Sequence, residues 1–225
     1  MPSPRPPQFP DDSSPAKKSA KGGRHSAGHA AGSVRIIGGN LRGRVLPYNG
    51  DPTTRPMKDR VREAIFNLIG PAVQGKHALD LFAGTGVVGF EAISRGAVRA
   101  TMLERHFPTA RSIRDNAELL GVKDQVEVAA GDSFVWVKRL KDLGPTPWLV
   151  FCCPPYSLYI VRQEDQLNMI DRLMQLAPAD SIFVVESDER FDPSLLPLAD
   201  QWDVRNYPPT IVAIYRKQSP NISET

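Results

Sequence analysis

The stretch Asp80-Leu81-Phe82-Ala83-Gly84-Thr85-Gly86 decides the fold of this 225-residue chain. An apolar run that is typical of a buried strand leads into Asp80, and the glycines that follow indicate a tight turn into a helix. A second loop, Cys153-Pro154-Pro155-Tyr156, also follows an apolar run. Because the carboxyl ends of parallel strands meet at one edge of a sheet, both loops should lie together where open α/β folds bind ligands.

Around these loops, short apolar segments alternate with segments of helical periodicity. This alternation indicates an α/β fold with a parallel sheet and right-handed crossovers. The end of the chain differs, because two apolar segments flank Pro208-Pro209 and predict a closing antiparallel pair. The predicted strands are 77–82, 99–104, 125–129, 148–152, 181–186, 202–207 and 211–215, and the predicted helices are 87–95, 107–120, 133–140 and 162–177.

The amino-terminal part carries additions to this core. Residues 1–33 contain six prolines and a single large apolar residue, Phe9, so we expect a disordered basic tail. The core domain should then span 34–217, leaving 218–225 as a second tail. Within it, 34–50 predicts a small β-hairpin that turns through Gly38-Gly39-Asn40, and helical spacing predicts a helix over 57–69.

The net charge of +3 is unevenly distributed along the chain. Residues 1–62 hold 12 Lys and Arg against 4 Asp, whereas the remainder holds 16 basic and 21 acidic residues. This asymmetry predicts a polyanionic partner on the amino-terminal side.

The cysteines and the apolar segments limit the classes to which the protein can belong. Cys152 and Cys153 are adjacent, an arrangement that suits neither a disulfide framework nor a zinc site, so we expect no metal. We find neither an apolar run near the twenty residues of a membrane span nor a secretion signal. We therefore expect a soluble, cytoplasmic monomer with no membrane partner.

The glycine loop predicts a nucleotide-containing ligand. Gly84-Thr85-Gly86-Val87-Val88-Gly89 fits a dinucleotide pattern, which leaves a nicotinamide-dependent oxidoreductase as one alternative. The carboxylate of Asp80 would repel a pyrophosphate but suits the ammonium and sulfonium groups of S-adenosylmethionine. Glu104 is placed to accept from ribose hydroxyls, and Asp132 could accept from the adenine amino group, cap the helix at Ser133, or do both.

Three stretches together resemble the RsmD family, bacterial methyltransferases that modify N2 of a guanine in 16S ribosomal RNA. They are the glycine loop, the opening Arg35-Ile36-Ile37-Gly38-Gly39, and the arginine-rich segment Arg55-Pro56-Met57-Lys58-Asp59-Arg60-Val61-Arg62-Glu63-Ala64-Ile65-Phe66-Asn67. The resemblance runs from about Val34 to Lys217.

This resemblance implies the Rossmann-like fold of class I methyltransferases, with a seven-stranded, mostly parallel sheet and an antiparallel carboxyl-terminal strand. It also implies S-adenosylmethionine as cofactor, with 16S rRNA or a small-subunit assembly intermediate as partner. The implied donor-binding residues are Asp80, Phe82, Ala83, Gly84, Gly86, Glu104, Asp132 and Ser133.

The reactive loop departs from the family pattern. The family normally has Asp or Asn before Pro-Pro and Tyr or Phe, whereas this chain has Cys153, so the candidate catalytic residues are Cys153, Pro154, Pro155 and Tyr156. The guanine amine is a poor nucleophile, so hydrogen-bond acceptors must orient it. A thiol is only a weak hydrogen-bond acceptor. Three interpretations stay open: a slower methyltransferase, which we favour, a catalytically silent RNA-binding or assembly protein, and a thiol nucleophile that attacks a pyrimidine.

Arginines before the glycine loop are the candidate RNA contacts. Arg60 and Arg62 could instead form a solvated helix face that pairs with Asp59 and Glu63, but their company with the other arginines before an amine-methylating pocket favours phosphate contact. The predicted RNA-binding residues are Arg35, Arg42, Arg44, Arg55, Arg60 and Arg62.

Overall fold

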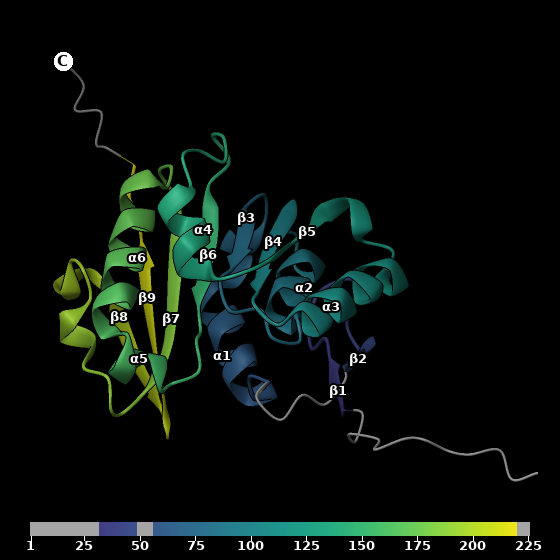
Figure 1. The fold of residues 1–225 in the computed structure, drawn as a ribbon, viewed down its shortest axis with the longest axis horizontal. Coiled ribbons are helices and arrows are strands. Elements are labelled where there is room, and N and C mark those ends of the chain that lie inside the picture. The colour runs from purple at the N-terminus through teal and green to yellow at the C-terminus, as the bar shows by residue number, and fades with distance from the viewer. Residues whose placement is uncertain (1–31, 49–55, 220–225) are drawn as a thin grey trace, which may run out of the picture.

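A computed structural model describes residues 32–48 and 56–219 of the chain. It shows a seven-stranded sheet in the order β5-β4-β3-β6-β7-β9-β8, in which β9 alone runs antiparallel to its neighbours (Figure 1). The predicted fold class is therefore confirmed. The strands are β3 (His77–Asp80), β4 (Arg99–Glu104), β5 (Val126–Ala130), β6 (Trp148–Cys152), β7 (Ile182–Asp188), β8 (Asp203–Tyr207) and β9 (Thr210–Arg216).

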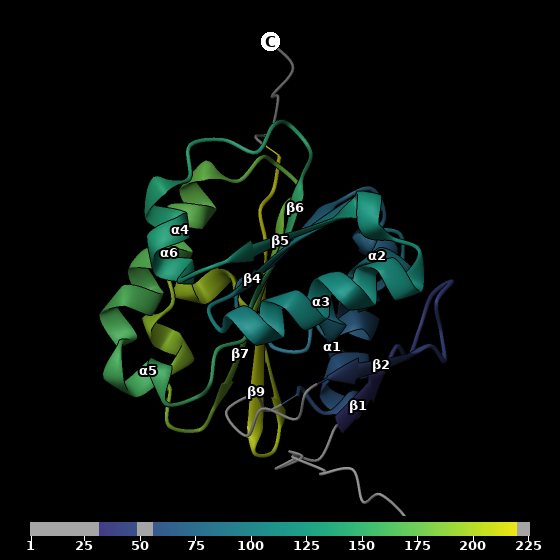
Figure 2. The ribbon, with the colours of Figure 1, turned by 45° about the vertical axis from the view of Figure 1, so that its right-hand side comes forward.

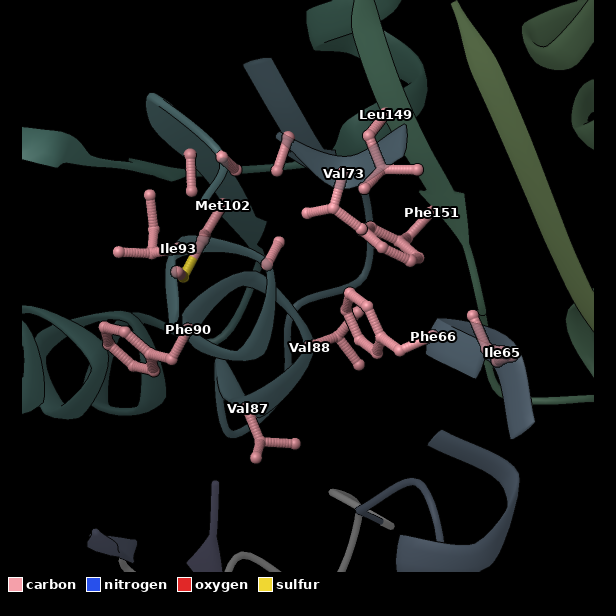
Figure 3. Close-up of a cluster of buried hydrophobic side chains, with 14 of the residues drawn as sticks. Ile65, Phe66, Val73, Val87, Val88, Phe90, Ile93, Met102, Leu149 and Phe151 are labelled. Carbon is pink, nitrogen blue, oxygen red and sulfur yellow. The ribbon is translucent and has the colours of Figure 1, made fainter. Parts of the chain in front are cut away.

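Helices cover both faces of the sheet, which explains why its central strands β3 and β6 are buried along their whole length. Figures 1 and 2 show α4 and α6 on one side, with α1, α2 and α3 on the other. Beneath the latter lies a buried cluster that includes Phe66, Phe90, Met102 and Phe151 (Figure 3). The helices are α1 (Asp59–Ile69), α2 (Val87–Ser94), α3 (Phe107–Leu120), α4 (Ser133–Arg139), α5 (Leu158–Val161) and α6 (Gln163–Leu176), of which the sequence did not predict α5 as a separate element.

The predicted amino-terminal hairpin is present, but its connection is longer than expected. Strands β1 (Gly32–Arg35) and β2 (Val45–Tyr48) pair antiparallel, and residues 36–44 connect them. Rather than making a tight hairpin turn, this segment docks on the end of α2, where the Asn40 amide donates to the Ser94 carbonyl over 2.8 Å. Gly39 has φ +76°, and a Cβ there would overlap the Ser94 backbone. The glycine therefore permits close docking.

A buried ion-pair network holds the hairpin and α1 against α2. The guanidinium of Arg62 is fully buried and donates to the Arg35 carbonyl over 2.7 Å and to Asp59 Oδ1 over 3.0 Å. Its Nε lies 3.6 Å from Oε2 of Glu91, which is also fully buried. Glu91 further accepts from the Ile37 amide and from Arg95 Nε, each over 2.8 Å. Charges so removed from water must be paired, so this network is a structural requirement.

The prediction that Arg62 contacts RNA is wrong, because a buried guanidinium cannot reach a phosphate. Arg62 lies three, four and seven residues before Ile65, Phe66 and Ile69, which are all buried on the same helix. This spacing places it on the apolar face of α1. In contrast, Arg60 is exposed.

We predict that Arg62→Ala lowers the free energy of unfolding by about 3 kcal/mol, because it leaves a buried carboxylate with one cation fewer. The neighbouring substitution Arg60→Ala should change it by less than about 0.5 kcal/mol, because an exposed side chain loses little. Urea unfolding of the two variants measures this difference. Equal stabilities would contradict the structural role of Arg62.

Candidate active site

A cavity of about 590 Å³ opens at the carboxyl edge of the sheet. Strands β3 and β6 are parallel neighbours with Asp80 opposite Phe151, so the loops that follow them emerge side by side, as predicted. The cavity is large enough for a small-molecule donor together with part of a second substrate. The predicted site residues that line it are Asp80, Phe82, Ala83, Gly84, Glu104, Asp132, Ser133, Cys153, Pro154, Pro155 and Tyr156.

Asp80 is a buried carboxylate at the base of this cavity. Its side chain accepts from the Gly89 amide over 3.2 Å, and the residue is 2% exposed. Burial raises its pKa to about 7, and the charge of Glu104 also raises it, against the lowering effect of the Gly89 and Phe82 amides. A cationic ligand group would stabilise the ionised form, as the ammonium of a methionine moiety can.

The glycine loop is shaped by Glu104 and by Gly86. The Glu104 carboxylate accepts from the Gly84 amide over 2.9 Å and from the His106 amide over 2.7 Å, and it still has lone pairs for a ribose hydroxyl. Gly86 has φ +76°, and a Cβ there would lie 2.9 Å from the Phe90 ring. Gly86 is not among the residues that line the cavity, so it shapes the turn rather than the cavity wall.

Asp132 and Ser133 have structural partners of their own. Asp132 caps α4, because its Oδ1 accepts from the Val135 amide over 3.1 Å, which confirms the capping interpretation. Ser133 donates its hydroxyl to the Leu81 carbonyl and so ties α4 to the glycine loop. An adenine contact by Asp132 stays a prediction. Beside it, the Arg162 guanidinium lies 3.8 Å over the Phe134 ring, a pair that the sequence did not suggest.

The reactive loop begins with a neutral thiol, that of Cys153. Burial raises the pKa of Cys153 well above its usual value, and the charges of Glu186 and Asp80 raise it further. Cys153 is therefore protonated at neutral pH, which disfavours the thiol-nucleophile interpretation, since the thiolate is the reactive form.

Tyr156 is held at the cavity wall by its hydroxyl. The phenol donates to Glu186 Oε1 over 2.8 Å, and its oxygen lies 3.1 Å from Thr210 Oγ1. Burial raises its pKa to about 12, so the phenol keeps its proton. Neither Glu186 nor Thr210 was predicted from the sequence, although both line the cavity.

Four of the predicted RNA-binding arginines are described and exposed, and none of the four lines this cavity. Arg35, Arg42, Arg44 and Arg60 are exposed, and Arg55 lies outside the described residues. A second hollow, between the hairpin and α1, is lined in part by Arg35 and Lys58. Pro56, Met57 and Lys58 line both spaces, so the hollow beside the hairpin adjoins the cavity.

The ranges 32–48 and 56–219 also bear on two other classes of site, metal centres and membrane-spanning helices. No group of three His, Cys, Asp or Glu residues in these ranges is arranged to hold a metal ion. None of the helices described there combines the length and apolarity needed to cross a membrane.

Comparison with known proteins identifies the family. The family model described as "Conserved hypothetical protein 95" matches residues 34–216. The chain belongs to this family, which is the RsmD family that its sequence resembles. The Ribosomal RNA small subunit methyltransferase D of Escherichia coli K12 is 34% identical over 162 residues, covering 70% of this chain and 76% of that protein. The protein of the same name from Haemophilus influenzae is 33% identical over 189 residues, covering 84% and 94%.

A solved structure supports the same relationship. The protein yhhF from Escherichia coli superposes with a TM-score of 0.66 at 29% identity, covering 84% of this chain and 100% of that one. The chain is thus a methyltransferase of the RsmD family, and its cofactor is S-adenosylmethionine. The cavity fits this group, because it combines a buried carboxylate, a glycine turn and a second carboxylate at the next strand end.

We predict that donor affinity falls as the pH drops below about 7, because protonation of Asp80 removes the charge that attracts the ammonium group. In Asp80→Asn the affinity should be weaker and nearly independent of pH from 6 to 8. Calorimetric titration with S-adenosylhomocysteine measures both. A wild-type affinity that is flat over this range would remove Asp80 from the donor site.

A second consequence concerns stability. The folded-state pKa of Asp80 lies above the unfolded value of 3.8, so its ionisation costs folding free energy as pH rises from about 4 to about 7. Asp80→Asn should therefore be more stable than the natural protein at pH 8, on the order of 3 kcal/mol, and nearly equal below pH 4. Thermal unfolding at both pH values checks the sign. A less stable variant at pH 8 would contradict the cost assigned to this carboxylate.

Proposed function

We propose that this chain transfers a methyl group from S-adenosylmethionine to the exocyclic N2 of a guanine in 16S rRNA. The observation that supports it most is the shared cavity, in which the donor-side Asp80 and the loop from Cys153 to Tyr156 lie at neighbouring strand ends. The names of the methyltransferase D relatives, which act on small-subunit ribosomal RNA, support the class of substrate.

The residues of the cavity suit an extruded base. The Tyr156 ring, anchored by its hydroxyl, offers a stacking surface for a flipped base. The carbonyl of Pro154 is the expected acceptor for one N–H of the guanine amine. When bound, the donor supplies an electrophilic methyl group: its C–S bond breaks as the N–C bond forms, and N2 gives up one proton to an acceptor. The protein chiefly supplies orientation, which accounts for much of such catalysis.

Cys153 should slow this reaction without abolishing it. A thiol accepts hydrogen bonds weakly, so the amine loses one of its orienting contacts. Losing one preorganised contact in other enzymes costs about 10²-fold. Pro154 and Tyr156 both line the cavity, which supports a role for them in holding the base.

We expect labelled donor to methylate unmethylated small-subunit RNA or particles slowly with the natural protein. The rate should rise by up to about 10²-fold with Cys153→Asn, because the amide oxygen restores an acceptor without adding a third carboxylate. Nucleoside mass spectrometry identifies the product as N2-methylguanosine. If the natural protein is silent and only the variant is active, the chain is an RNA-binding protein. If both bind the donor but modify no guanine, the proposed substrate is wrong.

The exposed arginines are proposed to position the RNA through its phosphates. Replacing Arg60 with Ala should weaken RNA binding and reduce the magnitude of the salt slope by about 1, because one counterion-releasing contact is lost. Filter binding at several salt concentrations measures the slope. Arg139→Ala removes an exposed arginine on α4, so it is a control with the same change in charge. Equal slopes for the two variants would remove Arg60 from the interface.

A further inference from the structure

Glu186 lies beside the reactive loop, at the end of the neighbouring strand. The register of β6 and β7 pairs Cys152 with Val185, so the following residues, Cys153 and Glu186, stand next to each other. Phe151 and Val184, two positions earlier, both lie in the cluster beneath α1 and α2. Because side chains alternate along a strand, Cys153 and Glu186 share that face of the sheet.

The carboxylate of Glu186 belongs to the wall of the same cavity. Glu186 is 8% exposed and lines the cavity together with Cys153 and Pro154. Its Oε1 accepts the Tyr156 phenol over 2.8 Å, which fixes the carboxylate against the ring proposed to stack on the base. The influence of Glu186 on the Cys153 pKa agrees with this proximity. An ionised carboxylate has about four lone-pair directions, so it can accept several donors at the same time.

Guanine presents two donors side by side on its pairing edge, N1–H and the N2 amine. A carboxylate matches such a pair, whereas the acceptor N1 of adenine would face it with like partial charge. The inference therefore rests on the proposed function, because it concerns how the same cavity selects and orients the guanine.

We propose that Glu186 is the specificity-determining residue of this site. It accepts N1–H and the N–H of the N2 amine that lies on the same side of the base. The single lone pair of the amine nitrogen, which stands perpendicular to the base plane, is then presented toward the donor side of the cavity, where Asp80 lies. The thiol at position 153 completes the packing between the carboxylates of Asp80 and Glu186 without adding a like charge.

A purely structural role predicts a different outcome. In that case Glu186 would only hold Tyr156, and breaking their hydrogen bond from either side would have the same effect. Glu186→Gln keeps the size of the side chain and an oxygen that can accept the phenol, but its NH₂ group opposes the donor edge of guanine. Tyr156→Phe keeps the ring and the carboxylate but removes the hydrogen bond.

The test uses an RNA fragment that carries the mapped target nucleotide, with guanine or inosine at that position, bound in the presence of S-adenosylhomocysteine. Inosine lacks the N2 amine but keeps N1–H, so it removes one of the two contacts. The natural protein should prefer guanine over inosine by about 10-fold or more, since hydrogen bonds to charged groups are the strong ones. Glu186→Gln should lose most of this preference and reduce kcat/KM for methylation by about 10 to 100-fold. Tyr156→Phe should keep the preference.

A rescue experiment separates loss of recognition from loss of structure. Adding Cys153→Asn to Glu186→Gln should restore at least several-fold of the lost rate, because the amide oxygen at position 153 replaces an acceptor. Unchanged affinity for S-adenosylhomocysteine shows that the variants are folded. If the natural protein methylates guanine N2 but Glu186→Gln keeps the guanine preference, this inference fails while the proposed function stands. If the natural protein methylates no guanine N2, the proposed function fails and the inference falls with it.

Discussion

The adjacency of β3 and β6 at the centre of the parallel sheet is the constraint on which the rest of the structure depends. Parallel pairing with Asp80 opposite Phe151 brings two loops, distant in sequence, to one edge. One loop carries the donor-side carboxylate and the glycine turn, and the other carries the acceptor side. Neither loop would form a site alone. The helices on both faces fix this pairing, because the strands they cover are buried and tolerate no change of register.

Two of the buried carboxylates, Glu91 and Asp80, have different surroundings, and the contrast distinguishes a structural role from a functional one. Glu91 is paired with Arg62 and Arg95, and it holds the amino-terminal hairpin against α2. Asp80 accepts a backbone amide instead, and no Lys or Arg within the described part of the chain forms an ion pair with it. Burial without a cationic partner raises the pKa of a carboxyl group, and ionising that group then lowers the stability of the fold. Such a cost at a cavity wall is typical of a binding site that a cationic ligand completes.

Sequence patterns predicted the sheet, the glycine loop and the reactive loop, because each depends on local periodicity or on residues close in the chain. They failed where the role of a residue depends on a contact partner that is far away in the sequence. Arg62 was counted among the RNA contacts although its spacing places it on the apolar face of α1, because the buried carboxylate that pairs with it, Glu91, is 29 residues away in the sequence. Gly38 to Asn40 resembled a hairpin turn, but they serve docking on Ser94. Glu186 gave no local signal, because its role appears only when β7 is placed beside β6.

The most direct test of this account is a crystal structure of the protein with S-adenosylhomocysteine and guanosine. The account predicts the amino end of the donor product at Asp80, its ribose at Glu104, and the guanine against Tyr156 with its N1 and N2 edge at Glu186. The N2 atom should then face the sulfur of the product. A product bound outside the cavity, or a guanine whose N2 points away from that sulfur, would contradict the account.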